Sequence, residues 1–87
     1  LQETETALTR YARELERRDS LRRARAQAAE AARIARLRYQ NGRDPFQIVL
    51  DTERSLSNIE AELARSEAQL SDYLVSVFLA LGGGWQS

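Results

Sequence analysis

The sequence contains no cysteine and no histidine among its 87 residues. Without cysteine the chain has no disulfide and no thiolate metal ligand, and without histidine it lacks the usual general base and the commonest metal ligand. A catalytic acid–base set would have to consist of carboxylates, and these fall on amphipathic helical patterns rather than around a pocket. We therefore expect no enzyme activity, no metal and no cofactor.

Loop-forming residues are also scarce, with one proline and four glycines, three of them consecutive at 82–84. The most apolar run begins at Tyr73 and is shorter than the roughly 18–20 residues that a membrane-spanning helix needs. Leu1 falls within a helical pattern and no signal peptide precedes it, so we expect the chain to be part of a longer protein. Its length allows one structural unit, 1–87.

The net charge is zero, but it is unevenly distributed. Residues 1–43 hold eleven arginines against six acids, whereas residues 44–87 hold two arginines against seven acids. The two halves thus carry net charges of +5 and −5. Opposite signs on two halves predict segments that lie against each other or against partners of complementary charge.

The second half carries a heptad pattern. One row of apolar residues recurs every seven positions, and a companion row lies three positions further on: Val49, Leu56, Leu63, Leu70 and Val77, then Ile59, Ser66, Tyr73 and Ala80. Such a seam predicts a long helix that packs along its length on a partner helix.

The first half is less regular. Leu1, Leu8 and Leu15 keep the seven-residue spacing, with Tyr11 between them. A small-residue stripe follows, consisting of Leu21, Ala24, Ala28, Ala31 and Ala35. The change of phase between Leu15 and Leu21 predicts a local change in coiling, or a change of partner.

Between the two patterns the residues favour a tight turn. Asn41 and Gly42 suit the end of a helix, with Gly42 as the left-handed C′ residue. Asp44 fits the N-cap of a second helix, Pro45 its first position and Gln47 the third, in a capping-box-like start.

A link this short predicts that the two helices form an antiparallel hairpin. We expect a helix over about 2–41, a tip at 41–45, a helix over about 45–81 and a Gly-rich tail at 82–87. At 1.5 Å per residue each arm would be roughly 55–60 Å long. The predicted fold is all-α, a long antiparallel two-helix coiled-coil hairpin. As part of a longer protein, the chain would keep seams meant for absent partners, so we expect it to self-associate on its own into a helical bundle, most simply a dimer of hairpins.

Several residues have a plain structural interpretation beside a functional one. The tip residues either only make the turn or also contact a partner. The basic stretch 17–38 can bind DNA phosphates, but its interspersed acids favour a solvated or subunit-facing surface. Asp51 and Arg54, three apart, could form a local ion pair.

Two motifs resemble those of a known family. Tyr39-x-x-Gly42, followed by Val-Leu-Asp at 49–51 and Arg-Ser-Leu at 54–56, is similar to the Y-x-x-G … V-L-D-A-Q-R-S-L signature of the TolC-type outer-membrane efflux proteins. The stretch Phe-Leu-Ala-Leu-Gly-Gly-Gly-Trp at 78–85 resembles the L-Y-x-A-L-G-G-G-W ending of the OprM-like lipoprotein branch. The resemblance covers essentially the whole chain.

The resemblance implies a segment of the periplasmic α-barrel of a trimeric outer-membrane channel, a passive conduit that exports drugs and other small molecules. The turn would lie at the periplasmic entrance. There Asn41, Gly42, Arg43 and Asp44 would contact a membrane-fusion adaptor protein, which in turn joins an inner-membrane pump.

By the same resemblance, Asp51 and Arg54 correspond to the charged residues that constrict the channel entrance. The family's D-A-Q-R is here Asp-Thr-Glu-Arg at 51–54, which adds a negative charge. Only Asp51 and Arg54 therefore carry over.

The alternative function is a free-standing coiled-coil oligomerisation or scaffold module. It would explain the heptads and the charged halves, but neither the turn motif nor the ending at 78–85. Nucleic-acid binding through 17–38 is a third hypothesis, which a salt-dependent gel shift would support.

Overall fold

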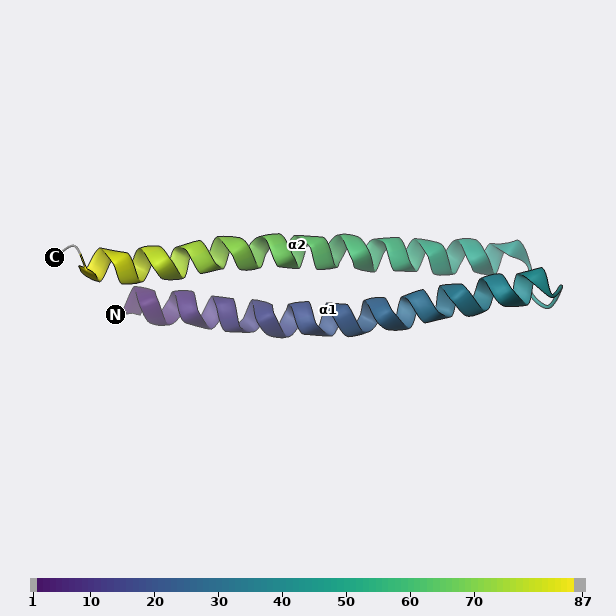
Figure 1. The fold of residues 1–87 in the computed structure, drawn as a ribbon, viewed down its shortest axis with the longest axis horizontal. Coiled ribbons are helices and arrows are strands. Elements are labelled where there is room, and N and C mark those ends of the chain that lie inside the picture. The colour runs from purple at the N-terminus through teal and green to yellow at the C-terminus, as the bar shows by residue number, and fades with distance from the viewer. Residues whose placement is uncertain (1, 86–87) are drawn as a thin grey trace.

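The computed structural model describes residues 2–85, with side chains up to residue 82, and consists of two helices joined by a turn (Figure 1). Helix α1 spans Gln2–Gln40 and helix α2 spans Phe46–Trp85. The helices run antiparallel, so that the two chain ends lie together and the turn lies at the opposite end (Figure 1). The molecule measures 69 × 14 × 12 Å. The predicted all-α hairpin is confirmed.

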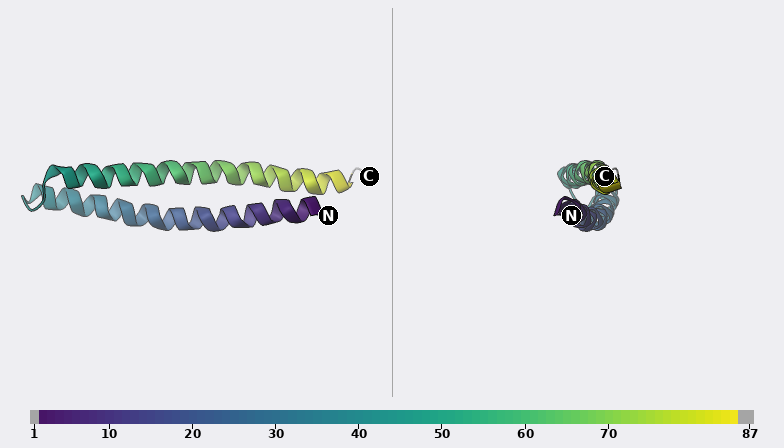
Figure 2. Two further views of the ribbon diagram at one scale, coloured as in Figure 1. Left: turned by 180° about the vertical axis from the view of Figure 1, so that it is seen from behind. Right: turned by 90° about the vertical axis from the view of Figure 1, so that its left-hand side faces the viewer.

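The two helices form a single layer. Seen from behind and from the end, they lie side by side, and no third element of residues 2–85 covers either face (Figure 2). Within the same residues, neither helix has a stretch that is long and apolar enough to cross a membrane.

The C-terminal boundary of α2 differs from the prediction. The turn occupies 41–45 as expected, but α2 continues through the three glycines to Trp85 instead of ending near residue 81. Each glycine lowers helix stability by about 1 kcal/mol relative to alanine, yet helical φ and ψ remain sterically open to it. No proline falls between residues 80 and 85 to stop the helix. The rest of the predicted tail, 86–87, lies outside the described residues.

The heptad seam of α2 faces α1, as predicted. Its most buried apolar side chains are Val49, Leu70 and Val77, which are 6–8% exposed. The other members of the two rows are half-buried, except for Ser66, which is fully enclosed. The sequence pattern therefore identified the packed face of this helix residue by residue.

Helix α1 packs through most of the residues that the sequence placed in its seam: Tyr11, Leu15, Leu21, Ala24, Ala28 and Ala35 are half-buried or buried. One row of less exposed residues has seven-residue spacing: Ala7, Glu14, Leu21, Ala28 and Ala35. The companion row consists of Thr4, Tyr11, Arg18 and Ala32 and is interrupted at Arg25, which is exposed. Leu8, which the sequence placed in the seam, is 49% exposed, and Ala31 is exposed as well. The row from Ala7 to Ala35 runs without a change of phase, whereas the companion row is interrupted just after Leu21, so the predicted local change in coiling stays a prediction.

The buried side chains of the two helices differ in size. The buried positions of α1 are Ala7, Ala32 and Ala35, whereas those of α2 include Val49, Leu70 and Val77. Small residues let two helices approach closely, and alternation of small and large side chains across facing positions fills the space between them. Leucine spacing alone therefore does not separate the packed positions of α1 from the exposed ones, since Leu15 and Leu21 are half-buried but Leu8 is exposed.

Ion pairs join the helices on both sides of the seam. Each runs from an arginine of α1 to a glutamate of α2: Arg17–Glu62 at 2.5 Å, Arg22–Glu67 at 3.4 Å, and Arg36–Glu53. These positions flank the buried rows, as charged pairs do in coiled coils. Such exposed pairs add little stability, but they confirm that the oppositely charged halves lie against each other.

Large apolar side chains remain exposed near both ends of the hairpin. The tip cluster consists of Ile34, Leu37, Tyr39, Phe46, Ile48 and Leu50, and the open-end cluster of Leu8, Leu74, Val75, Phe78, Leu79 and Leu81. Phe78 and Leu79 are the most exposed, at 66% and 71%. Contiguous exposed apolar surface is typical of interaction sites. Self-association of the chain stays a prediction, now with defined surfaces.

Candidate functional site at the hairpin turn

Helix α1 ends in a backbone arrangement built on Gly42. The φ of Gly42 is +70°, in the left-handed region that favours glycine. The N–H of Arg43 donates to the carbonyl of Arg38 at 2.8 Å, and the N–H of Gly42 donates to the carbonyl of Tyr39 at 3.0 Å. These two bonds are the 6→1 and 5→2 pair of the Schellman motif. The predicted role of Gly42 as the C′ residue is confirmed.

Asn41 supports the same helix end with its side chain. Its backbone N–H and its Nδ2 both donate to the carbonyl of Leu37, at 3.1 and 2.9 Å. The side-chain amide of Asn41 is therefore directed back along α1 and is used within the turn.

Asp44 does not cap α2, contrary to the prediction. Its carboxylate accepts hydrogen bonds from Arg38, with 2.6 Å between Nε and Oδ2 and 3.3 Å between Nη2 and Oδ1. The other half of the predicted capping box is also absent, because Gln47 donates to Asp51 at 3.0 Å. A guanidinium fork is a stronger partner for a carboxylate than a backbone N–H, which explains why Asp44 binds Arg38 instead of the N–H groups at the start of α2.

The Arg38 side chain also sets the electrostatics of the turn. Its hydrogen bonds and its charge lower the pKa of Asp44 below the ordinary value for aspartate. The carboxylate of Asp44 raises the pKa of Arg38 in return. Both groups therefore stay charged at neutral pH, and their opposite charges compensate each other.

An aromatic pair closes the base of the turn. The rings of Tyr39 and Phe46, one from each helix, have centroids 5.1 Å apart and planes inclined by 59°. Tilted pairs at this distance are favourable beyond the area that they bury. Sequence reasoning used Tyr39 only as a motif residue and missed both its partner and Arg38. Two aromatic residues that flank a predicted turn symmetrically are the signal that could have revealed the pair.

Of the four predicted tip residues, Arg43 alone keeps a charged side chain available for a partner. Its guanidinium makes no hydrogen bond or ion pair with the part of the chain that the structure describes. The side chains of Asn41 and Asp44 are engaged within the turn, and Gly42 presents only backbone. A Cβ placed on Gly42 would meet nothing within 4 Å, so this backbone is open to the surroundings.

Asp51 and Arg54 lie on α2, five and eight residues after Phe46, and both are exposed. They form no ion pair with each other, so the plain interpretation as a local pair was wrong. Asp51 instead accepts the bond from Gln47. At 3.6 residues per turn, these two residues stand one to two turns beyond the tip. The structure brings 41–44 together, but it does not join Asp51 and Arg54 to them.

A shallow groove runs beside Asp51 between the helices. Its lining consists of small side chains apart from Asp51 itself: Ala28, Ala31, Thr52 and Ser55. Small residues at such a place leave room for a neighbouring helix to approach. Across residues 2–85, no group of three or more acidic residues is placed to hold a metal ion.

Comparison with known proteins gives one match. The chain is 38% identical over 61 residues to the pyoverdine export outer membrane protein OpmQ of Pseudomonas putida, and the match covers 70% of this chain. The match covers 13% of that relative, so the matched stretch spans about an eighth of the relative's length. No family model matches the chain. No solved structure matches it either. Together with the hairpin fold and the turn motif, this similarity shows that the chain belongs, as a helical-hairpin segment, to the TolC/OprM-like family of outer-membrane efflux proteins.

Proposed function

We propose that the chain is part of the wall of an export channel of the outer membrane, a passive conduit that performs no catalysis. The observation that carries this proposal is the similarity to a pyoverdine export outer membrane protein, over a stretch that folds here as one long hairpin. Drugs and other small molecules would pass through the assembled channel, as pyoverdine is exported by the named relative. The parent protein would reside in the outer membrane, with this hairpin in the periplasm.

The geometry supports a role as one element of a larger wall. A single layer 69 Å long and 12 Å thin has two open faces, and apolar side chains are exposed at both of its ends. Neighbouring helices of the same protein would cover these side chains in a closed ring. We propose that three subunits complete the ring, and that an adaptor protein and an inner-membrane pump extend it.

The turn is the proposed contact with the adaptor. Arg43 offers a free guanidinium at the tip, and the backbone at Gly42 is unobstructed. Large apolar side chains of the tip cluster, such as Ile48 and Leu50, are exposed at the same end of the hairpin. Aromatic residues and arginine are enriched in protein interfaces relative to the rest of the surface.

Asp51 and Arg54 are the proposed entrance residues. Their exposure on α2, away from the α1 seam, leaves them free to face the channel or a neighbouring subunit. In a trimer each would occur three times around the axis. A ring of three carboxylates attracts cations, and pairing of Asp51 with an arginine of the next subunit would narrow the entrance.

The test uses the full-length parent protein in cells. Asp51→Ala and Arg54→Ala are compared with Asn58→Ala, an exposed polar position one turn further along α2. Dye efflux and the uptake of a large antibiotic are measured in parallel. We expect both entrance variants to change envelope permeability, while Asn58→Ala behaves as wild type.

A second variant tests the turn separately. Gly42→Trp places a bulky side chain at the tip and should abolish efflux without making the envelope leaky, because the adaptor no longer docks. If none of the three variants at 42, 51 and 54 changes efflux or permeability, the entrance assignment fails. The scaffold hypothesis would then be the better account.

A further inference from the structure

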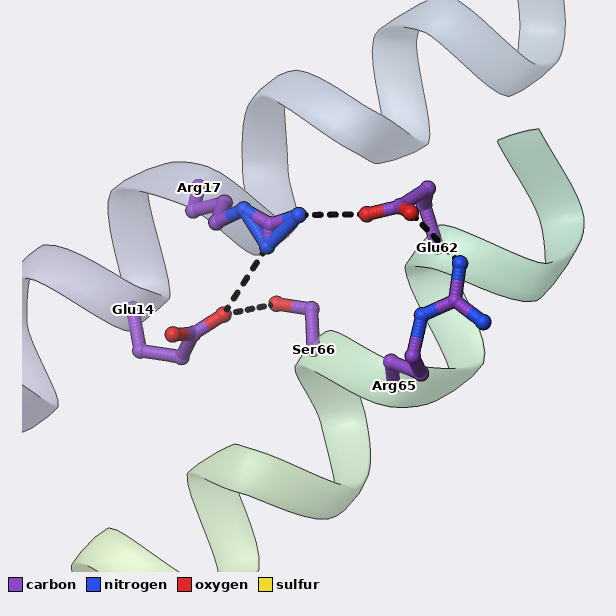
Figure 3. A network of polar contacts seen from close by, with 5 residues as sticks. All are labelled: Glu14, Arg17, Glu62, Arg65 and Ser66. Atoms are coloured by element: carbon purple, nitrogen blue, oxygen red, sulfur yellow. Dashed lines mark hydrogen bonds and ion pairs between the residues drawn. The ribbon is translucent and has the colours of Figure 1, made fainter. Parts of the chain in front are cut away.

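Halfway along the hairpin, a polar side chain is buried in the apolar seam. Ser66 of α2 is 1% exposed and is the only buried polar side chain among the residues that the structure describes. Opposite it, in the seam of α1, stands Glu14, whose side chain is 12% exposed. The hydroxyl of Ser66 donates to Oε2 of Glu14 at 2.5 Å (Figure 3).

The pair is connected to the surface through a chain of charges. Nη1 of Arg17 lies 3.9 Å from Oε2 of Glu14, and its Nη2 lies 2.5 Å from Glu62 on the other helix. Glu62 is also paired with Arg65 at 2.5 Å (Figure 3). The network thus crosses the seam twice, through Ser66–Glu14 inside and Arg17–Glu62 at its edge.

Stability alone does not explain this pair. Removing a carboxylate from water is costly, and apolar side chains of similar volume at such positions are often equally stable or more stable. Leucine at both positions would continue the apolar rows of the seam. A different contribution is therefore needed to account for Glu14 and Ser66, and polar residues at seam positions of coiled coils are known to specify register and partner.

The surrounding seam makes the pair selective for one alignment. A shift of α2 by one heptad along α1 would place Ile59 or Tyr73 opposite Glu14, in place of Ser66. Ile59 cannot donate a hydrogen bond, and the hydroxyl of Tyr73 sits much further from the backbone. Ser66 would meanwhile face an alanine or a leucine of α1, neither of which accepts a hydrogen bond. A slipped alignment buries a carboxylate without its donor.

The turn fixes the alignment of α1 and α2 within one chain, but it has no influence on pairing between chains. Both helices carry long seams, so α1 of one copy can pair with α2 of another, or two copies of α1 can pair together. We propose that Glu14 and Ser66 form a registration key, a polar pair that selects this α1–α2 pairing and disfavours slipped and exchanged arrangements. The inference concerns folding specificity and does not depend on the proposed export function.

The test replaces the key in the complete 87-residue chain. In the variant Glu14→Leu/Ser66→Leu, we expect a melting temperature equal to or above that of wild type. Its ¹H–¹⁵N spectrum should nevertheless show several sets of amide peaks, and sedimentation should show a mixture of masses. Wild type should show one set of peaks and one dominant species. The variant Glu14→Gln keeps a carbonyl acceptor for Ser66 and should preserve the single set.

The matched control is Arg22→Ala/Glu67→Ala, which removes a cross-helix ion pair that lies outside the seam. It should retain a single set of peaks. The proposal is overturned if the double leucine variant also keeps one set of peaks and one species. It is equally overturned if that variant melts more than about 5 °C below wild type, since the pair would then contribute stability rather than specificity. Should the leucine variant precipitate, the spectrum of Glu14→Gln decides: multiple peak sets there contradict the proposed acceptor role.

Discussion

The guanidinium of Arg38 holds the carboxylate of Asp44 across the turn, with its Nε and Nη2 at 2.6 and 3.3 Å from the two carboxylate oxygens. The bond joins the last turn of α1 to the residue that precedes Pro45 and α2. In the same turn, the left-handed residue Gly42 already lets main-chain hydrogen bonds close the end of α1. The turn is therefore fixed twice, once by main-chain bonds and once by a charged pair of side chains.

The first prediction concerns the acidity of Asp44. Because the Arg38 guanidinium lowers the pKa of Asp44, Arg38→Gln should raise that pKa towards the ordinary value of about 3.9. The measurement is the ¹³C shift of the Asp44 carboxyl group as a function of pH. Arg33→Gln is the control, because Arg33 pairs with Glu30 elsewhere on α1 and should leave Asp44 unchanged. Equal pKa values of Asp44 in wild type and Arg38→Gln would contradict the pairing.

The same pair makes stability depend on pH with a definite sign. A carboxyl group whose pKa is lowered by folding contributes stability above its unfolded pKa, and this contribution is lost as pH falls through the folded pKa. The melting temperature of wild type should therefore fall on acidification below about pH 4. In Arg38→Gln the fall should be smaller, since Asp44 then binds its proton at nearly the same pH in both states.

The second prediction tests the left-handed residue of the turn. Gly42→Ala should lower the free energy of unfolding by about 1–2 kcal/mol, because a side chain at φ +70° is strained although no atom obstructs it. That corresponds to a melting temperature lower by about 5–10 °C. Gly42→Asn should cost less, since asparagine tolerates this conformation better. An alanine variant as stable as the asparagine variant would show that the turn has rearranged.

The third prediction tests which of two neighbouring alanines of α1 is covered by α2, since the predicted small-residue stripe contained Ala31 whereas the structure buries Ala32. Ala32 is 1% exposed, whereas its neighbour Ala31 is exposed. Ala32→Leu should overpack the seam and cost about 1–3 kcal/mol, and Ala31→Leu should change stability by less than about 0.5 kcal/mol. Thermal unfolding followed by circular dichroism at one fixed chain concentration measures both. The reverse order of effects would restore the predicted stripe.

The fourth prediction concerns the open-end cluster. Phe78 and Leu79 are the most exposed large apolar side chains of the hairpin, so Phe78→Ser/Leu79→Ser should weaken self-association while leaving helix content unchanged. Sedimentation equilibrium over a range of concentrations measures the association. Asn58→Ser, on the exposed side of the same helix, serves as the control. If wild type sediments as a monomer at every concentration, the open-end cluster does not mediate self-association.

The sequence predicted one helix better than the other, and the reason is physical. In α2 the buried residues other than Ser66 are large and apolar, so burial and hydropathy select the same positions, from Val49 to Val77. In α1 the most buried residues are alanines, whose hydropathy barely distinguishes a buried position from an exposed one. Ala31 and Ala32 look alike in the sequence, and only the partner helix decides which of them is covered.

In the turn, too, the sequence does not reveal which partner a given side chain has. Backbone requirements are local, so Gly42 could be assigned its conformation from its place after a helical pattern. The partner of Asp44 could not be assigned from the sequence, because a backbone N–H and an arginine guanidinium are both suitable donors for its carboxylate. Choosing between a backbone N–H and the guanidinium of Arg38 requires the path of the chain through the turn, which the sequence does not contain.

The hydrogen-bonded end of α1 has a consequence for molecular recognition at the tip. The carbonyls of Leu37, Arg38 and Tyr39 already receive donors from within the turn. These three acceptors are therefore not available to a visiting polypeptide at the last turn of α1. A partner that recognises this end of the helix would have to do so through side chains such as Arg43, so a point substitution there would change recognition without altering the main-chain bonds of the turn.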